Sequence, residues 1–199
     1  MRLFIYKYYC SEFKFNSYND LIEQLIMDIF MNLIARIFNL KSHKNNKLDS
    51  EFRINNDKNY ETNISSLVNK NNYTSSTQFL IYVDLNNFKV NIFKGKKNQW
   101  NIINSYLCTI GKNSTPTPTG TYKIGVKGLY FGVNKGYKCW YYTSFKGNYL
   151  FHSILYNLDG TIRDGRLGMK LSDGCIRLLK PNAKYIYDNI PQGTKVIIK

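Results

Sequence analysis

The chain has 199 residues, which suits one ordinary domain with an extension and is too short for two large domains. Its 28 Lys and Arg residues outnumber 13 Asp and Glu residues, and the net charge of +15 favours polyanions such as nucleic acid, anionic membranes or anionic wall polymers. The lysines are spread among Asn and Tyr without an Arg-rich tract, a zinc-finger spacing or an RNP-like motif, which argues against specific nucleic-acid binding.

Four cysteines stand far apart and form no CxxC pair, so the sequence predicts neither a zinc site nor a dense disulfide framework. They are Cys10, Cys108, Cys139 and Cys175. Whether Cys108 and Cys139 pair depends on a distance that the sequence does not give. Residues 1–15 are rich in Tyr and Lys and lack the apolar region and small-residue cleavage site of a signal peptide, so no export signal is predicted.

The N-terminal segment, residues 1–40, is predicted to carry an amphipathic helix over residues 21–40. Apolar residues at positions 22, 25, 26, 29, 33, 37 and 40 have the spacing of one helical face. Charged residues such as Asp28 and Arg36 interrupt the stretch, which argues against a membrane span. We expect the apolar face to pack against the chain's own domain, with peripheral membrane contact through residues 21–40 as the alternative.

A polar linker is predicted over residues 41–78. This segment is rich in Asn, Lys and Ser, has no sustained hydrophobic periodicity and cannot bury much apolar surface. His43 stands alone within it, and no other cluster has metal-ligand spacing, so no metal is implied.

A mainly β domain is predicted over residues 79–199. The runs FLIYVDL and FKVNIFKG flank Asn86 and Asn87, which tolerate a tight turn, and they predict an opening β-hairpin. Further expected strands are residues 100–110, TYKIGV after the extended TPTPTG segment at 115–120, and residues 138–145, 149–154 and 195–198. One short helix is expected at residues 182–189, after Pro181.

A cysteine and a histidine in this domain are candidates for acyl-transfer chemistry. Cys175 and His152 stand 23 positions apart in a segment rich in glycines and polar turns. A thiol attacks a carbonyl as thiolate, which a neighbouring imidazole can generate, and Gly174 permits close approach of substrate beside free amide groups. Taken alone, each residue would more often be a buried structural side chain.

The surrounding motifs favour the catalytic interpretation. The sequence S-x-G-C-I-R at 172–177, the upstream F-H-S at 151–153 and the TPTPTG segment resemble the L,D-transpeptidase (YkuD-type) catalytic domain. The resemblance covers residues 79–199, including IYVDLNNFKVNIF at its start and GTKVII at its end. It implies a β-sandwich or barrel with one short helix near the C-terminus.

The resemblance also implies a reaction, a location and partners. Cys175 would attack the carbonyl of the third residue of a peptidoglycan stem peptide, release the terminal D-alanine and leave a thioester that an amine acceptor resolves. His152 would be the base, oriented by the backbone carbonyl of Ser153. No cofactor is implied, and the enzyme would work in wall biogenesis outside the cytoplasm, where its charge would also favour anionic wall polymers.

Further site residues follow from the same motif. Ser172, Asp173 and Gly174 would shape the turn and the oxyanion site. Arg177, two positions beyond Cys175, would share its face in an extended chain and would either steer a substrate carboxylate or support the loop.

The segment 156–168 is too polar and glycine-rich for a packed strand, and we expect it to border the cleft and help to hold substrate through Tyr156. Family members often use a phenol to donate to the oxyanion. The aromatic candidates near the site are Tyr130, Tyr137, Trp140, Tyr141, Tyr142 and Tyr156.

One position departs from the family pattern, because Asp173 stands where a second histidine is usual. An anion close to Cys175 would disfavour the thiolate, unless Asp173 faces solvent or pairs with a cation. The expected cations are Arg163, Arg166 and Lys170.

Three alternatives to transpeptidation remain open at this stage. An L,D-carboxypeptidase would use water as acceptor of the same acyl-enzyme. A catalytically weakened wall-binding module would fit Asp173 and the basic surface. A nucleic-acid-binding protein rests on charge alone.

Overall fold

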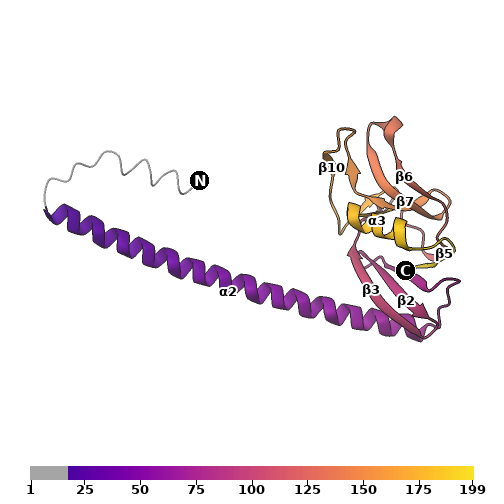
Figure 1. Ribbon diagram of the computed structural model, residues 1–199, viewed down its shortest axis with the longest axis horizontal. Coiled ribbons are helices and arrows are strands. Elements are labelled where there is room, and N and C mark those ends of the chain that lie inside the picture. The colour runs from indigo at the N-terminus through magenta and orange to yellow at the C-terminus, as the bar shows by residue number, and fades with distance from the viewer. Residues whose placement is uncertain (1–17) are drawn as a thin grey trace. The chain divides into compact units, whose positions relative to one another are not determined.

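A computed structural model describes the backbone of residues 18–199 and the side chains of residues 26–37 and 55–199. The chain divides into two compact units, Met1–Asp57 and Lys58–Lys199. The second unit contains all of the strands and is shown with the rest of the chain in Figure 1.

Helix α2 spans Tyr18–Lys70 and includes the segment predicted to be helical. The apolar side chains described in its first unit, among them Ile26, Ile29, Leu33 and Ile37, are exposed. Among the described residues, no helix has an apolar stretch long enough to cross a membrane. The predicted helix over residues 21–40 is therefore confirmed, and the surface that its apolar face contacts stays a prediction.

The segment predicted to be a polar linker, residues 41–78, is helical over most of its length, because α2 continues to Lys70. The helix end within the second unit packs on the sheet with Ile64 and Val68 buried. Its Asn69 side chain accepts from the Trp100 amide at 2.8 Å and donates to the Trp100 carbonyl at 3.0 Å. The apolar positions 60, 64 and 68 form only a narrow stripe among Asn, Lys and Ser, which hid this helix from a search for hydrophobic periodicity.

The first sheet contains five strands in the order β3-β2-β1-β13-β5. Its strands are β1 (Phe79–Asp84), β2 (Lys89–Lys96), β3 (Gln99–Leu107), β5 (Gly120–Lys123) and β13 (Lys195–Ile198). The predicted hairpin is confirmed as β1 and β2, and the Asp84 carboxylate orders its turn by accepting from the amides of Asn86 and Asn87 at 3.1 and 3.0 Å. The closing strand β13 pairs in parallel with β1.

The second sheet has the order β10-β9-β7-β8-β12, with β6 paired to β7. Its strands are β6 (Lys127–Phe131), β7 (Lys138–Lys146), β8 (Tyr149–Ser153), β9 (Leu155–Tyr156), β10 (Ile162–Asp164) and β12 (Ile176–Leu178). A short parallel pair joins β4 (Ile110–Gly111) to β11 (Lys170–Ser172).

The predicted strands over residues 138–145 and 149–154 are confirmed as β7 and β8. The sequence missed β10, which lies inside the polar segment 156–168. This strand is at the sheet edge and mostly exposed, so it needs no apolar alternation. A 3-10 turn, η1 (Val133–Lys135), connects β6 to β7.

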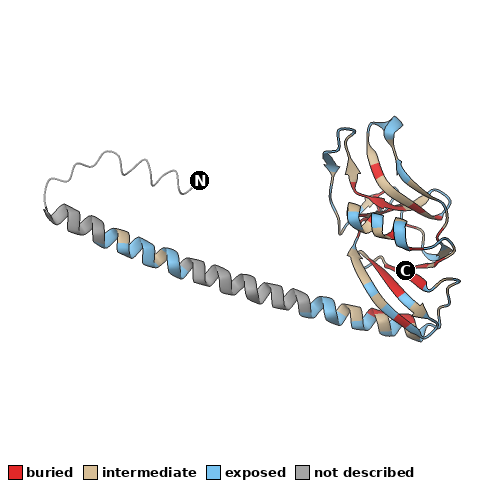
Figure 2. Cartoon of the chain, in the orientation of Figure 1, coloured by how far each residue is buried: buried red, intermediate tan, exposed pale blue. Residues whose placement is uncertain are grey.

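The main core lies where the two sheets face each other, and buried residues from both sheets follow their strands (Figure 2). It includes Ile81 and Ile92 from the first sheet and Phe151 and Ile176 from the second. Helix α3 (Lys180–Asn189) covers β7 and β8, and it begins two residues before the predicted helix because Pro181 is tolerated in a first helical turn. The domain is therefore mainly β, as the sequence predicts.

Candidate active site

Two parallel strands bring the candidate cysteine and histidine together. Strand β12 pairs with β8 in a register that sets Phe151 opposite Ile176 and His152 opposite Arg177. Cys175 immediately precedes Ile176, and paired strands lie about 4.8 Å apart. A separation of 23 positions in sequence thus becomes adjacency in the sheet.

The nucleophile turn, residues 172–175, is held by its own hydrogen bonds. The buried Ser172 hydroxyl donates to the Cys175 carbonyl at 2.5 Å and accepts from the Gly174 amide at 3.2 Å. Gly174 has a φ of +101°, and a Cβ there would lie 2.5 Å from Cε1 of Tyr149. Only glycine fits this position without displacing the ring.

The TPTPTG segment supports the nucleophile turn from behind. Thr115 Oγ1 donates to the Ser172 carbonyl at 3.3 Å, and the Lys112 amide donates to the same oxygen at 2.9 Å. The Thr117 hydroxyl accepts from the Gly111 amide at 2.8 Å, which fixes the path of the segment. The motif therefore has a structural role next to Cys175.

The Cys175 side chain is partly accessible and is a free thiol. Its Sγ donates to the carbonyl of Asn148 at 3.6 Å. Burial raises the pKa of this thiol, while the backbone amide of Leu150 and the charge of Arg177 oppose that rise. Cys175 is accordingly protonated at neutral pH.

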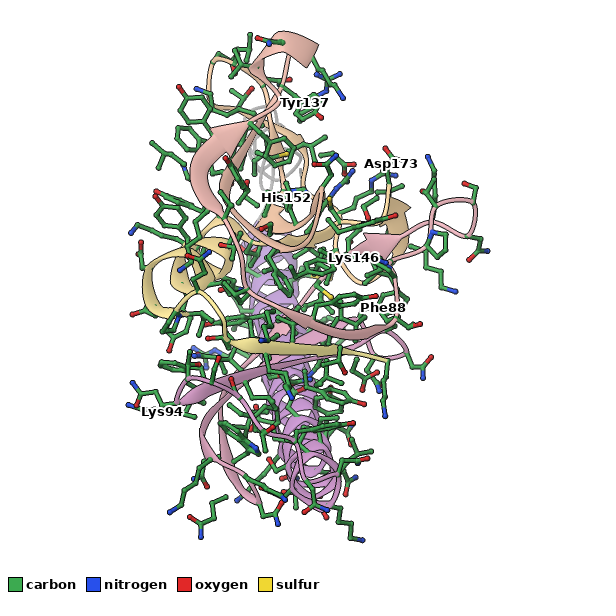
Figure 3. All side chains as sticks on the ribbon, turned by 90° about the vertical axis from the view of Figure 1, so that its right-hand side faces the viewer. Phe88, Lys94, Tyr137, Lys146, His152 and Asp173 are labelled. Atoms are coloured by element: carbon green, nitrogen blue, oxygen red, sulfur yellow. The ribbon has the colours of Figure 1, made fainter. Side chains whose placement is uncertain are left out.

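His152 is 4% exposed, and its Nδ1 lies 2.7 Å from the carbonyl oxygen of Ser153. A carbonyl oxygen only accepts, so this hydrogen bond places the proton on Nδ1 and leaves Nε2 with its lone pair. Burial lowers the pKa of His152 to about 4, against the opposing effect of the Ser153 hydrogen bond. The lowered pKa keeps the imidazole neutral at pH 7, and the Phe131 ring, which packs edge-on at a centroid distance of 5.1 Å, restricts its orientation. Figure 3 labels His152 within the domain.

Asp173 lies at the rim and its side chain is 81% exposed. Lys112 Nζ is 2.6 Å from its Oδ1, and this hydrogen bond is the main reason that the pKa of Asp173 is lowered. Of the two expected arrangements, the solvent-facing one is present, and the paired cation is Lys112, from the segment after β4, instead of Arg163, Arg166 or Lys170. The effect of Asp173 on the thiol pKa is smaller than that of Arg177.

Arg177 lies on β12 with its side chain 12% exposed. Its Nη1 donates to Oδ2 of Asp164 at 3.1 Å, and its buried Nε has no hydrogen-bond partner. Arg177 was expected to share the face of Cys175. In the structure it lies opposite His152 in the β8–β12 register. Sequence reasoning missed Asp164, and no motif marks it.

Tyr156 lies on β9, where Lys180 Nζ is 5.4 Å from its ring centroid. The structure therefore connects Tyr156 with helix α3 instead of with the catalytic pair. Burial raises the pKa of Tyr137, and the charges of Cys139, Arg177 and Cys175 act on it to a smaller extent. Figure 3 shows Tyr137 above His152 in the same part of the domain.

An open pocket of about 390 Å³ borders the histidine side of the site. It is lined by Tyr130, Phe131, Gly132, Val133, Asn134, Lys135 and Tyr137. Because the Phe131 ring contacts His152, a group bound in the pocket would lie near the base.

Cys108 and Cys139 are buried free thiols, and Cys10 lies outside the described residues. Burial raises the pKa of Cys139 to about 12 and raises that of Cys108 further. Within the part of the chain that the structure describes, no three His, Cys, Asp or Glu side chains are grouped as metal ligands would be.

Comparison with known proteins identifies the class of this domain. A model of the L,D-transpeptidase catalytic domain (YkuD) matches residues 78–198. Putative L,D-transpeptidase YciB of Bacillus subtilis is 39% identical over 89 residues, which cover 41% of this chain and 46% of YciB. Probable L,D-transpeptidase ErfK/SrfK of Escherichia coli is 46% identical over 44 residues, which cover 22% of this chain and 14% of that protein.

Among solved structures, a fused Zn-dependent amidase, peptidase and peptidoglycan-binding domain-containing protein from Clostridium acetobutylicum is 43% identical, with a TM-score of 0.62. The alignment covers 71% of this chain and 61% of that one. The chain matches less than half of the length of YciB and of ErfK/SrfK. Because the family model matches residues 78–198, the chain belongs to the L,D-transpeptidase (YkuD) catalytic domain family.

Proposed function

We propose that this domain is a peptidoglycan L,D-transpeptidase with Cys175 as nucleophile and His152 as general base. The observation that carries the proposal is the hydrogen bond from His152 Nδ1 to the Ser153 carbonyl, because it leaves Nε2 as an acceptor on the strand paired with the cysteine. Family membership supports an acyl-transfer enzyme. Membership of the family also supports a stem-peptide substrate.

The reaction would begin with the thiol turning from the Asn148 carbonyl toward His152. Nε2 accepts the thiol proton while the sulfur attacks the carbonyl carbon of the third stem residue. The tetrahedral oxyanion collapses, the amine of the leaving D-alanine takes the proton from His152, and a thioester remains. An amine of a second stem then attacks the thioester and regenerates the thiol.

The resting proton states favour this sequence of events. Because the pKa of Cys175 is raised and that of His152 is lowered, both groups are neutral before substrate binds. The thiol proton therefore has to be taken up by His152 during the reaction, as in general-base catalysis, since no thiolate is present at rest. The buried imidazole gains a charge only while the reaction proceeds.

The remaining residues would have supporting roles. Ser172 and Gly174 hold the turn that presents the thiol, and Arg177 would attract an anionic group of the substrate through its charge, which also acts on Cys175 and His152. Tyr137 supplies the phenol beside the site, a role for which Tyr156 is less well placed.

Because the proposed substrate is peptidoglycan, the enzyme would act in the cell envelope. The charge of +15 favours contact with anionic wall polymers, and the exposed apolar side chains described within residues 26–37 support peripheral membrane contact through the helix of residues 21–40. These partners are part of the same proposal.

Intact-protein mass spectrometry with a carbapenem tests the nucleophile. Wild type should gain one adduct, and Cys175→Ala, which retains Cys108 and Cys139, should gain none. The wall-binding alternative is favoured if wild type gains no adduct and if wild type and Cys175→Ala bind isolated cell wall equally well.

Product analysis on defined stem peptides then separates the two acceptors. Cross-linked or amine-exchanged products identify a transpeptidase, and a free tripeptide stem alone identifies an L,D-carboxypeptidase.

A further inference from the structure

Three charged side chains lie together beside the catalytic pair. Asp164 ends β10, Arg166 follows it, and Arg177 comes from β12. Oδ2 of Asp164 accepts from Arg177 Nη1 at 3.1 Å, and Oδ1 accepts from Arg166 Nε at 2.9 Å. Arg177 is 12% exposed and Arg166 is 61% exposed. Asp164 therefore joins one buried and one exposed guanidinium.

Arg177 lies where its charge reaches both catalytic groups. It is opposite His152 in the β8–β12 register and two positions beyond Cys175, so the three side chains share one region of the sheet. Its Nε is buried without a hydrogen-bond partner. A buried guanidinium is costly unless an anion holds it, and Asp164 is the carboxylate that does so here.

The strand that carries Asp164 contacts the site a second time. Arg163 Nη1 donates to the Gly136 carbonyl at 2.9 Å, and its guanidinium lies 5.7 Å from the Tyr137 ring centroid. Two neighbouring residues of β10 thus contact different segments: Asp164 bonds to Arg177, and Arg163 contacts Gly136 and Tyr137. Strand β10 is therefore connected to β12 and to the segment after η1.

We propose that Asp164 is a positioning residue, whose carboxylate fixes the Arg177 guanidinium beside Cys175 and His152 and so sets the electrostatic surroundings of the thiol. The effect on acylation rests on the proposed function. The effect on the thiol itself is testable without turnover.

A competing role for Asp164 makes the opposite prediction. If Asp164 only neutralised Arg177, removing the carboxylate would strengthen the positive field at Cys175 and lower the pKa of the thiol. If Asp164 positions Arg177, its removal lets the guanidinium leave, and the pKa of the thiol rises. The charged and titratable groups that act on Cys175 or its neighbours are His152 on β8, Arg177 on β12, Asp173 in the nucleophile turn, Tyr137 after η1 and Cys139 on β7.

The direction of the change in the pKa of the Cys175 thiol is measured by alkylating Cys175 with iodoacetamide at a series of pH values and quantifying the modified peptide. For Asp164→Asn we expect alkylation to be roughly three- to ten-fold slower at pH 8, the change that an increase of half to one pKa unit produces. Arg177→Gln should shift the profile in the same direction, and Asp164→Asn with Arg177→Gln should match Arg177→Gln alone.

Arg166→Ala is the matched control, because it removes an exposed donor to the same carboxylate and leaves the Arg177 bond in place. Its alkylation profile should equal that of wild type. A faster or unchanged profile for Asp164→Asn, or additive effects in the double variant, would overturn the positioning role. Thermal unfolding of each variant shows that the compared proteins are folded.

Acylation by a carbapenem provides the second readout. Asp164→Asn should lower the acylation rate about ten-fold, because the Arg177 guanidinium is no longer held beside the thiol, and Asp164→Glu should recover part of the rate. If wild type is never acylated but Asp164→Asn still slows alkylation, the proposed function fails and the positioning of Arg177 stands. If acylation occurs and Asp164→Asn equals wild type in both assays, the inference about Asp164 fails.

Discussion

The nucleophile turn carries Cys175, and the β9–β10 hairpin reaches Arg177 two positions further along the chain, but the two segments are specified in different ways. In the turn, Ser172 bonds to Gly174 and Cys175, so residues within three positions set most of its shape. In the hairpin, Asp164 matters through Arg177, a residue on another strand. The shape of the turn is thus mostly local, with support from the segment after β4, whereas the electrostatic surroundings of Cys175 are set by long-range contacts.

The largest effect is expected from removing the base. His152→Gln should lower the carbapenem acylation rate by about 10²–10⁴-fold, since that is the usual contribution of general-base catalysis. Stopped-flow loss of carbapenem absorbance measures it. A fall below ten-fold would show that the surroundings of Cys175 activate the thiol without His152.

The turn is tested by two glycines that share a positive φ. At Gly174 a Cβ would meet the Tyr149 ring at 2.5 Å, whereas at Gly160, with a φ of +92°, nothing lies within 4 Å. Gly174→Ala should lower acylation at least ten-fold and destabilise the domain by about 2–4 kcal/mol, from backbone strain of about 1–3 kcal/mol plus the steric contact.

Gly160→Ala should cost only the backbone strain, about 1 kcal/mol, and should leave acylation unchanged. Equal effects of the two substitutions on acylation would mean that the close packing around Gly174 has no catalytic importance. Denaturant unfolding gives the stabilities.

The buried base also predicts how stability depends on pH. Because the pKa of His152 falls to about 4 on folding, the unfolded chain binds a proton between pH 6.5 and 4 that the folded chain does not. Stability should therefore fall as pH drops through this window, by up to about 3 kcal/mol. His152→Gln should lose this part of the pH dependence. If the free energy of unfolding depends on pH in the same way in both proteins, the pKa of His152 is not lowered.

The smallest effect is expected at Asp173. Its carboxylate pairs with Lys112 at the rim, so Asp173→His should change the acylation rate less than about three-fold, as for other exposed ion pairs. An increase of ten-fold or more would show that the carboxylate acts on the thiol, and would move the electrostatic control of Cys175 into the turn.

Much of the site was predictable because its signals are short-range. The residues S-D-G-C predict a turn, in which Gly174 has a φ of +101°, and the family motif assigns His152 its contact with the Ser153 carbonyl, which is present at 2.7 Å. The two β-rich runs on either side of Asn86 and Asn87 likewise predict β1 and β2. Local hydrogen bonds and backbone dihedrals are encoded by neighbouring residues, so a sequence displays them directly.

The tertiary structure alone decided which distant charges meet. Lys112 pairs with Asp173, and Asp164 forms an ion pair with Arg177. It also decided that the end of α2, which is rich in polar residues, packs on the first sheet. Ion pairing and burial depend on distances between elements, and those distances exist only once the two sheets have packed. The sequence by itself determined the family and the candidate pair, Cys175 and His152, and the packed fold determined the electrostatic surroundings of that pair.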